Sequence, residues 1–309
     1  MVHQRNGLLS DDALTRPDEG AVYTCAIAVI GGSTAAYTAA LTALKLRLDV
    51  CLVQPQRVVG GQFTAQALPA SDDGDLLRHQ ADLMSIGGEE FALSQSQRLS
   101  RKRQRQLQPV AGRQVADPGG SWVCPLSTTP VTASTALNEP LIPYLKTGKL
   151  TLIPYAEPTS LLLATAGDRR RVTGVVCADT KTNHTFTVNA QVVVEATDFG
   201  DLLEIAQLPA RVGQEARSDT GEAILPEDAR PQCQQSFTFD VLVERTYPGR
   251  GVPVGAPKEY GRVTWLNLKE FTGDFWVSKN KTWKKRDFFD AFGIFRYRRL
   301  QRRSLTKTK

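Results

Sequence analysis

The chain has 309 residues, of which 41% are hydrophobic and 23% are charged. These proportions are ordinary for a globular protein of about two domains, and they exclude a wholly disordered, collagen-like or coiled-coil chain. No apolar run is long enough to cross a bilayer, and the five cysteines and three histidines are too scattered to suggest a disulfide framework or a metal site. We therefore expect a soluble, cytoplasmic protein with no membrane partner and no metal.

The charge is unevenly distributed along the chain. The formal net charge is +6, but residues 279–309 contain twelve basic and two acidic residues, so the rest of the chain is net negative. A body with that charge is not expected to bind nucleic acid. We predict a basic tail at 279–309, either a solvated end or a segment that once continued into further protein, although it could also touch phosphate or an anionic membrane surface.

The first fifty residues have the pattern of a parallel α/β unit. Residues 1–20 are polar and are predicted to form a disordered tail. An apolar run at 25–31 is typical of a strand buried on both faces, the alanine- and leucine-rich stretch 33–47 favours a helix, and 49–53 form a second buried strand. The order of strand, glycine turn, helix and strand predicts the start of a parallel sheet.

An insertion and a β-meander follow this unit. We expect a helical insertion at 71–147, whose last helix is interrupted by Pro140 and Pro143. Hairpin signals then predict an antiparallel three-stranded meander at 157–190, with its third strand at 184–190, and 191–195 return as a separate buried strand.

The composition changes after the α/β part of the sequence, which we place at 21–210. Between 211 and 278 glycine, proline and aromatic residues become more frequent and the periodicity is lost. We predict that 211–278 form part of a substrate or cap region.

A glycine-rich turn links the first strand to the first helix. The pattern G-x-G-x-x-G provides a tight turn, a close approach of backbone to a diphosphate and close packing of the helix, and its three slots here hold Gly31, Ser33 and Ala36. The helix that begins there offers unpaired N–H groups and a positive dipole end to phosphates. The alternative is a plain tight turn. The candidate phosphate-binding residues are Gly31, Gly32, Ser33, Thr34 and Ala36.

Gln54, at the end of the second strand, departs from the usual pattern. An acidic residue about 20 positions after the first glycine normally holds a ribose hydroxyl. Glutamine can also hydrogen-bond a hydroxyl, but more weakly than a carboxylate does. We therefore expect Gln54 to contact the ribose and the cofactor to bind less tightly.

Four further segments have recognisable patterns. They are 60–67 (GGQFTAQA), 119–123 (GGSWV), 195–203 (EATDFGDLL) and 288–300 (FFDAFGIFRYRRL). Together with 30–54, they resemble FAD-dependent oxidoreductases of the glutathione-reductase-like flavoprotein class. The resemblance extends over most of the chain, and its most specific parts are the first turn, GGQ and ATDFGD.

The resemblance implies an α/β fold with a Rossmann-like FAD-binding domain at 21–210, in which the meander is inserted beside a parallel sheet. It implies FAD as a noncovalent cofactor. It also places Gly60, Gly61 and Gln62 beside the isoalloxazine ring or the ribityl chain, because glycines let backbone pass close to a flat ligand. The alternative for Gly60-Gly61 is a flexible loop.

The end of the last strand of this domain is expected near the FAD phosphates. The resemblance places Thr197 and Asp198 there. Asp198 and Asp201 could bind ribityl hydroxyls or could cap the following helix. No catalytic residue is identified, since His79 is more simply a surface histidine than a proton donor.

Two functions remain open at this point. The first is an FAD-dependent oxidoreductase acting on a small-molecule substrate. The second is a truncated or split noncatalytic remnant, because members of the class continue for a few hundred residues and supply a glycine-aspartate segment that completes the FAD site. Such a remnant would need a partner chain. A weaker third idea is a pyridine-nucleotide enzyme that uses the same turn.

Overall fold

The computed structural model describes most of the α/β part of the chain and short pieces elsewhere. Several predicted features lie outside these residues, namely His79, the segments 119–123 and 288–300, and most of the insertion at 71–147. The residues described are 2–68, 109–110, 113–114, 128–167, 169–235, 274–279 and 282–287.

The chain divides into two compact units, each with one interruption in the sequence. The first consists of residues 1–66 and 134–240, and the second of residues 67–133 and 241–309. The expected insertion at 71–147 and cap at 211–278 do not coincide with these limits, and their boundaries stay predictions.

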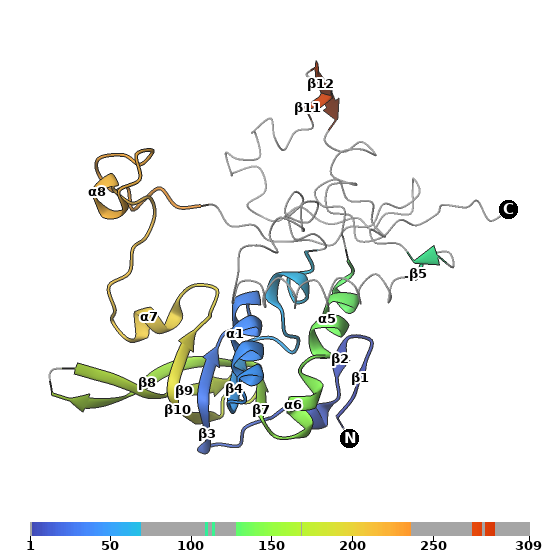
Figure 1. Cartoon of the computed structure of the whole chain (residues 1–309), viewed down its shortest axis with the longest axis vertical. Helices are drawn as coiled ribbons and strands as arrows, with labels where there is room; N and C mark the ends of the chain where they lie inside the picture. Colours follow the sequence, from blue (N-terminus) through green and yellow to red (C-terminus); the bar gives the residue numbers. More distant parts are fainter. Residues whose placement is uncertain are drawn as a thin grey trace, which may run out of the picture. The chain divides into compact units, whose positions relative to one another are not determined.

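A six-stranded sheet forms the centre of the first unit, in the order β7-β4-β3-β10-β9-β8 (Figure 1). Strands β7, β4, β3 and β10 are parallel, whereas β9 is antiparallel to both β10 and β8. This confirms the predicted α/β fold with a parallel sheet and an adjoining antiparallel meander. The bounds are β3 (Ala21–Ile30), β4 (Val50–Gln54), β7 (Leu150–Pro154), β8 (Ala156–Ala166), β9 (Arg169–Asp179) and β10 (Thr185–Glu195).

The prediction of two separate strands at 184–190 and 191–195 is wrong. They form one strand, β10, which pairs with β3 from Phe186↔Ala21 to Glu195↔Ile30. Because the first half of β10 also pairs with β3, β3 begins at Ala21, four residues before the predicted start. The first half of β10 also pairs with β9, so one strand belongs both to the meander and to the parallel sheet.

The first twenty residues are not a disordered tail. They form strands β1 (Gln4–Arg5) and β2 (Leu8–Leu9) and the short 3₁₀ helix η1 (Asp11–Ala13). Leu9 and Ala13 are buried in the same core cluster as the first helix. The few apolar side chains in this polar stretch therefore dock on the body of the unit.

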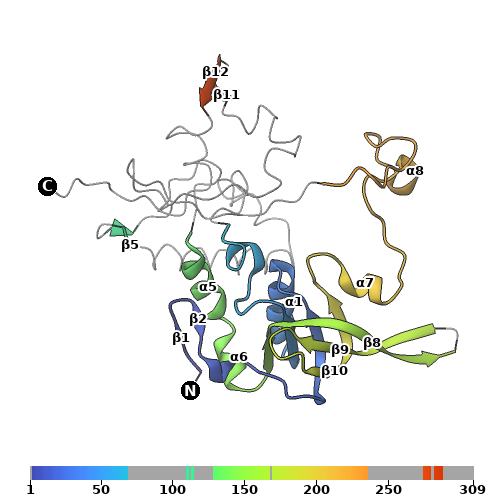
Figure 2. The same cartoon turned by 180° about the vertical axis from the view of Figure 1, so that it is seen from behind.

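Helices cover one face of the sheet, where the larger of two apolar clusters lies (Figures 1 and 2). The second cluster lies among the strands and includes three buried free cysteines, Cys25, Cys51 and Cys177, as their apolar strand patterns predict. The predicted helix with two prolines is split into two, and Pro143 stands in the first turn of the second. The helices are α1 (Thr34–Lys45), α5 (Pro130–Asn138) and α6 (Ile142–Lys146).

The remaining described elements are short. Strands β11 and β12 pair antiparallel, and the expected limit between a cap and a basic tail at 278/279 lies within β11, so this limit stays a prediction. Within the described residues, no helix has the length and apolar character that crossing a bilayer requires. The elements are η2 (Gly61–Phe63), β5 (Pro109–Val110), β6 (Arg113–Gln114), α7 (Asp201–Ile205), α8 (Arg217–Thr220), β11 (Asp274–Lys279) and β12 (Thr282–Asp287).

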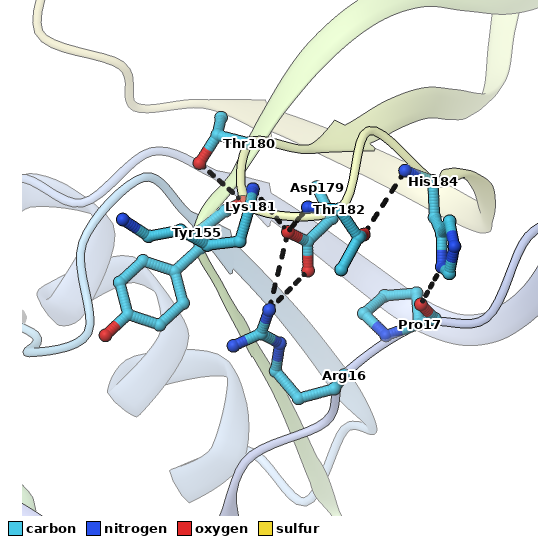
Figure 3. A network of polar contacts seen from close by, with 8 residues as sticks. All are labelled: Arg16, Pro17, Tyr155, Asp179, Thr180, Lys181, Thr182 and His184. Carbon is cyan, nitrogen blue, oxygen red and sulfur yellow. Dashed lines mark hydrogen bonds and ion pairs between the residues drawn. The ribbon is translucent and has the colours of Figure 1, made fainter.

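A buried carboxylate fixes the turn between β9 and β10 (Figure 3). The Asp179 side chain is 1% exposed, and its Oδ1 accepts the N–H groups of Lys181 (2.7 Å) and Thr182 (3.1 Å). The Arg16 guanidinium lies 3.0 Å from its Oδ2. Because Arg16 belongs to the N-terminal segment, the same carboxylate ties that segment to the meander.

We predict that Asp179→Ala lowers the free energy of unfolding by about 2–3 kcal/mol, because two charge-assisted hydrogen bonds and one ion pair are lost. Urea denaturation measures the change. The matched control is Glu157→Ala, at an exposed position of β8, which should cost no more than about 0.5 kcal/mol. Equal losses in the two variants would show that the carboxylate does not have this role.

Candidate cofactor-binding site

The turn after β3 is closed by Gly31, whose φ is +136°. Its N–H donates to the carbonyl of Val53 at 2.8 Å. A Cβ at this position would overlap the carbonyl of Ala196 and lie 2.6 Å from the nitrogen of Thr197. Only glycine allows the end of β10 to cross so close to the turn.

Ser33 is the N-cap of α1. Its Oγ accepts the N–H of Ala36 at 3.1 Å and donates to the carbonyl of Ala196 at 2.9 Å. The hydroxyl therefore joins the turn to the end of β10. Its O–H already donates to Ala196 and is not available to donate to a ligand. Ala36, the third slot of the motif, is buried in the core against the sheet, as that slot requires.

Four backbone N–H groups at the start of α1 make no hydrogen bond to any described residue. They carry the partial positive charge of a helix N-terminus and are the donors that an anion can use. Gly32 is buried and closely packed, since a Cβ there would lie 2.5 Å from Oε1 of Gln56. The groups are the amides of Gly32, Ser33, Thr34 and Ala35.

Gln54 ends β4 beside this turn. Its side chain is 1% exposed, and neither Oε1 nor Nε2 has a hydrogen-bond partner within the described structure. A Cβ on Gly32 would lie 3.6 Å from that of Gln54, so the amide adjoins the turn. An unsatisfied buried amide costs about 1–3 kcal/mol, which a ligand with one donor and one acceptor would recover.

The GGQ segment packs directly on the turn. Gly60 and Gly61 are buried with φ of +104° and +47°. A Cβ on Gly61 would lie 3.0 Å from Cα of Ser33, and one on Gly60 would overlap Leu137. Thr64 fixes the segment by donating from Oγ1 to the carbonyl of Val59 at 2.7 Å. This packing does not fit a flexible loop.

The end of β10 is organised by Glu195, a residue that the sequence interpretation missed. Its carboxylate accepts the N–H of Thr197 at 2.5 Å and that of Leu202 at 2.7 Å. Oγ1 of Thr197 accepts the N–H of Asp201 at 2.9 Å. Glu195 and Thr197 therefore cap α7. The available signal was an acid six residues before the helix, directly before the ATDFGD segment.

Asp198 and Asp201 were considered as caps of the following helix, but Glu195 and Thr197 cap it instead. Asp198 is exposed and accepts no hydrogen bond from the described residues. The pKa of Asp201 is raised by partial burial and by the negative charges of Glu195, Glu204 and Asp198. The N–H of Thr197, expected near phosphates, is occupied by Glu195.

The structure thus brings most of the candidate residues together at one end of the parallel strands, which is where open α/β sheets bind ligands. Gln62 and Asp198 are exposed and contribute no contact that holds the site. The residues that form one contiguous group are Gly31, Gly32, Ser33, Thr34, Ala36, Gln54, Gly60, Gly61 and Thr197.

Comparisons with known proteins identify a family. Residues 26–306 match the model of a protein family described as FAD dependent oxidoreductase. A search of curated proteins found no match.

Solved structures with a similar fold are distant. THI4 of Thermovibrio ammonificans is 15% identical, with 67% of this chain and 76% of that chain covered and a TM-score of 0.38. A geranylgeranyl bacteriochlorophyll reductase-like protein of Thermoplasma acidophilum is 14% identical (62% and 45% covered, TM-score 0.34). The 3-ketosteroid-Δ4-(5α)-dehydrogenase of Rhodococcus jostii RHA1 is 12% identical (57% and 48% covered, TM-score 0.32). The chain therefore spans about three quarters of the first and less than half of the other two, and likeness of this degree carries no argument about function.

We predict that Gly31→Ala unfolds the first unit or destabilises it by more than about 3 kcal/mol, because the new Cβ overlaps the backbone of Ala196 and φ is unfavourable. The matched control is Gly148→Ala, where φ is +70° but nothing lies within 4 Å of the new Cβ. That variant should lose only about 1 kcal/mol. Circular dichroism and urea titration compare the two, and a Gly31→Ala protein as stable as the control would contradict the assigned crossing.

Proposed function

The chain belongs to the family of FAD dependent oxidoreductases, and we propose that it binds FAD noncovalently at the turn of residues 31–36 and acts on a small-molecule substrate. FAD is the cofactor of this family. The observation that carries the proposal is the group of four free N–H donors at the start of α1 beside the unpartnered amide of Gln54.

The residues at the turn fit the diphosphate of FAD. The N–H groups of Gly32, Ser33, Thr34 and Ala35 bond to none of the described residues, and the dipole of a twelve-residue helix adds to their attraction for a dianionic group. Gly31 and Gly61 let the end of β10 and the GGQ segment pack directly on this turn, which fixes the position of the amides. The turn therefore supplies position and charge compensation for phosphate.

The amide of Gln54 fits the ribose of the adenosine half. A vicinal diol can donate one hydroxyl to Oε1 and accept Nε2–H with the other, so both unsatisfied atoms gain a partner at once. A carboxylate at this position would accept from two hydroxyls and bind more strongly. We therefore propose that the cofactor is held less tightly than it would be with an acid here.

The bound flavin would supply the electron-transfer chemistry that side chains cannot supply. The chain's own residues would bind and orient it: the α1 amides hold phosphate and Gln54 holds the ribose. The segment of Gly60 and Gly61, which packs on Leu137 and Ser33, would lie beside the flavin. The three buried free thiols support a reducing, cytoplasmic environment as part of the proposal.

A chain that completes its FAD site with a partner is the alternative proposal. One observation favours it: the N–H of Thr197 is bonded to Glu195, so the end of β10 offers one donor fewer to phosphate. A noncatalytic remnant of this kind would bind FAD only when the partner is added.

We predict that the purified chain absorbs in the flavin bands after FAD is added and excess FAD is removed. Gln54→Leu should weaken FAD binding by about 5- to 150-fold, because about 1–3 kcal/mol of hydrogen bonding is lost. Gln54→Glu should strengthen it. Isothermal titration calorimetry measures the FAD dissociation constant of the wild type, Gln54→Leu and Gln54→Glu.

The control for this series is Gln191→Leu, at an exposed position of β10, which should leave the affinity unchanged. If the wild-type chain binds no FAD in any concentration range, binding by this chain alone is refuted. If it binds and Gln54→Leu binds equally well, only the assignment of the ribose contact fails.

A further inference from the structure

A short two-stranded ribbon extends the meander beyond the sheet. The pairing of β9 with β10 ends at Gly174, while the pairing of β9 with β8 continues to Ala166↔Arg169. Figures 1 and 2 show the β8–β9 hairpin reaching away from the other strands. We call Leu163–Ala166 and Arg169–Val172 the arginine ribbon.

The ribbon presents three adjacent cations without a counter-charge. Arg169, Arg170 and Arg171 are exposed, and the residues opposite them in the register are two alanines and a threonine. None of the three forms an ion pair with any described residue, and Arg171 makes only a 3.4 Å hydrogen bond to the carbonyl of Gln191. One acid, Asp168, lies between the two strands in the sequence, so residues 163–172 together carry a formal net charge of +2.

The remainder of this part of the chain is unsuited to an extended polyanion. Apart from residues 163–172, residues 134–235 contain six basic and twelve acidic residues. Nucleic acid or an anionic bilayer that met the ribbon would be repelled by this surrounding charge. A partner with a small acidic patch is favoured instead.

The chain itself carries such a patch. We call it the acidic loop, and it consists of Asp198, Asp201 and Glu204 around Glu195, with no lysine or arginine of the described residues paired to it. The mutual repulsion contributes to the raised pKa of Asp201. A cation supplied from outside would relieve this repulsion.

The two patches lie on the same border of the sheet. Helix α7, which contains most of the acidic loop, contacts β8, and β8 is one strand of the ribbon. A second copy related by a twofold axis can therefore place its ribbon on the acidic loop of the first copy and receive the reverse contact. We propose that this border is the interface of a homodimer, in which the arginine ribbon of each copy binds the acidic loop of the other.

Exposed apolar side chains stand beside both patches. Phe199, within the acidic loop, is 91% exposed, and Leu163, on the ribbon, is 46% exposed. Surface ion pairs contribute little individually, so burial of these side chains must supply much of the association energy. The dimer is accordingly weak and sensitive to salt.

Charge reversal tests the interface in the full-length chain. Variant A carries Arg169→Glu, Arg170→Glu and Arg171→Glu, and variant B carries Asp198→Arg and Glu204→Arg. In either variant alone like charges face each other, so dimerisation should weaken by at least about tenfold. When A and B are mixed, both contacts become attractive again, and a heterodimer should form.

Sedimentation equilibrium at low and high salt measures the dimer dissociation constants of the wild type, of variants A and B and of their mixture. Circular dichroism checks that both variants fold. Lys146→Glu, on an exposed face of α6, is the control and should dimerise as the wild type does. The proposal is overturned if the wild type stays monomeric up to about 1 mM at low salt. It is also overturned if folded A and B dimerise as strongly as the wild type, or if their mixture gives no heterodimer. None of these outcomes depends on FAD.

Discussion

The close crossing of the end of β10 over the turn after β3 is the constraint on which the rest of the site depends. Gly31 has no Cβ because the carbonyl of Ala196 occupies that space, and Ser33 bonds to the same carbonyl. Next to this crossing, the first amides of α1 have no partner among the described residues. The anion site that we propose there is built by backbone packing.

The same packing explains why the site is neutral in character. Glu195, at the end of β10, caps α7, the Asp198 and Glu204 side chains are exposed, and Gln54, which adjoins the turn, holds an uncharged amide. A diphosphate approaching α1 therefore meets dipoles and one buried glutamine. Affinity for a dinucleotide then depends on many modest contacts, each sensitive to the exact placement of backbone.

Much of this arrangement could be predicted from local sequence. The apolar runs, the alanine-rich helix and the G-x-G-x-x-G spacing identified β3, α1 and β4, and the position of Gln54 followed from its distance to Gly31. The docking of the first twenty residues escaped prediction because their few apolar side chains that reach the core, among them Leu9 and Ala13, follow no periodic pattern.

The missed role of Glu195 and the false break in β10 have a common origin. Both result from pairing with elements distant in sequence, which no local window contains. The hydrogen bond of the Thr197 N–H could not be predicted either. Its acceptor is the Glu195 carboxylate, and the direction of that side chain is set by the pairing of β10.

The unbroken course of β10 has a consequence for how such a chain can vary. This strand runs from the Asp179 turn to Glu195, and successive side chains point to opposite faces. Loss or gain of one residue within it would turn Glu195 to the wrong face and uncap α7. Length changes between related sequences should therefore accumulate at the hairpin tips around 167 and 182, and the interior of the strand should keep a constant number of residues.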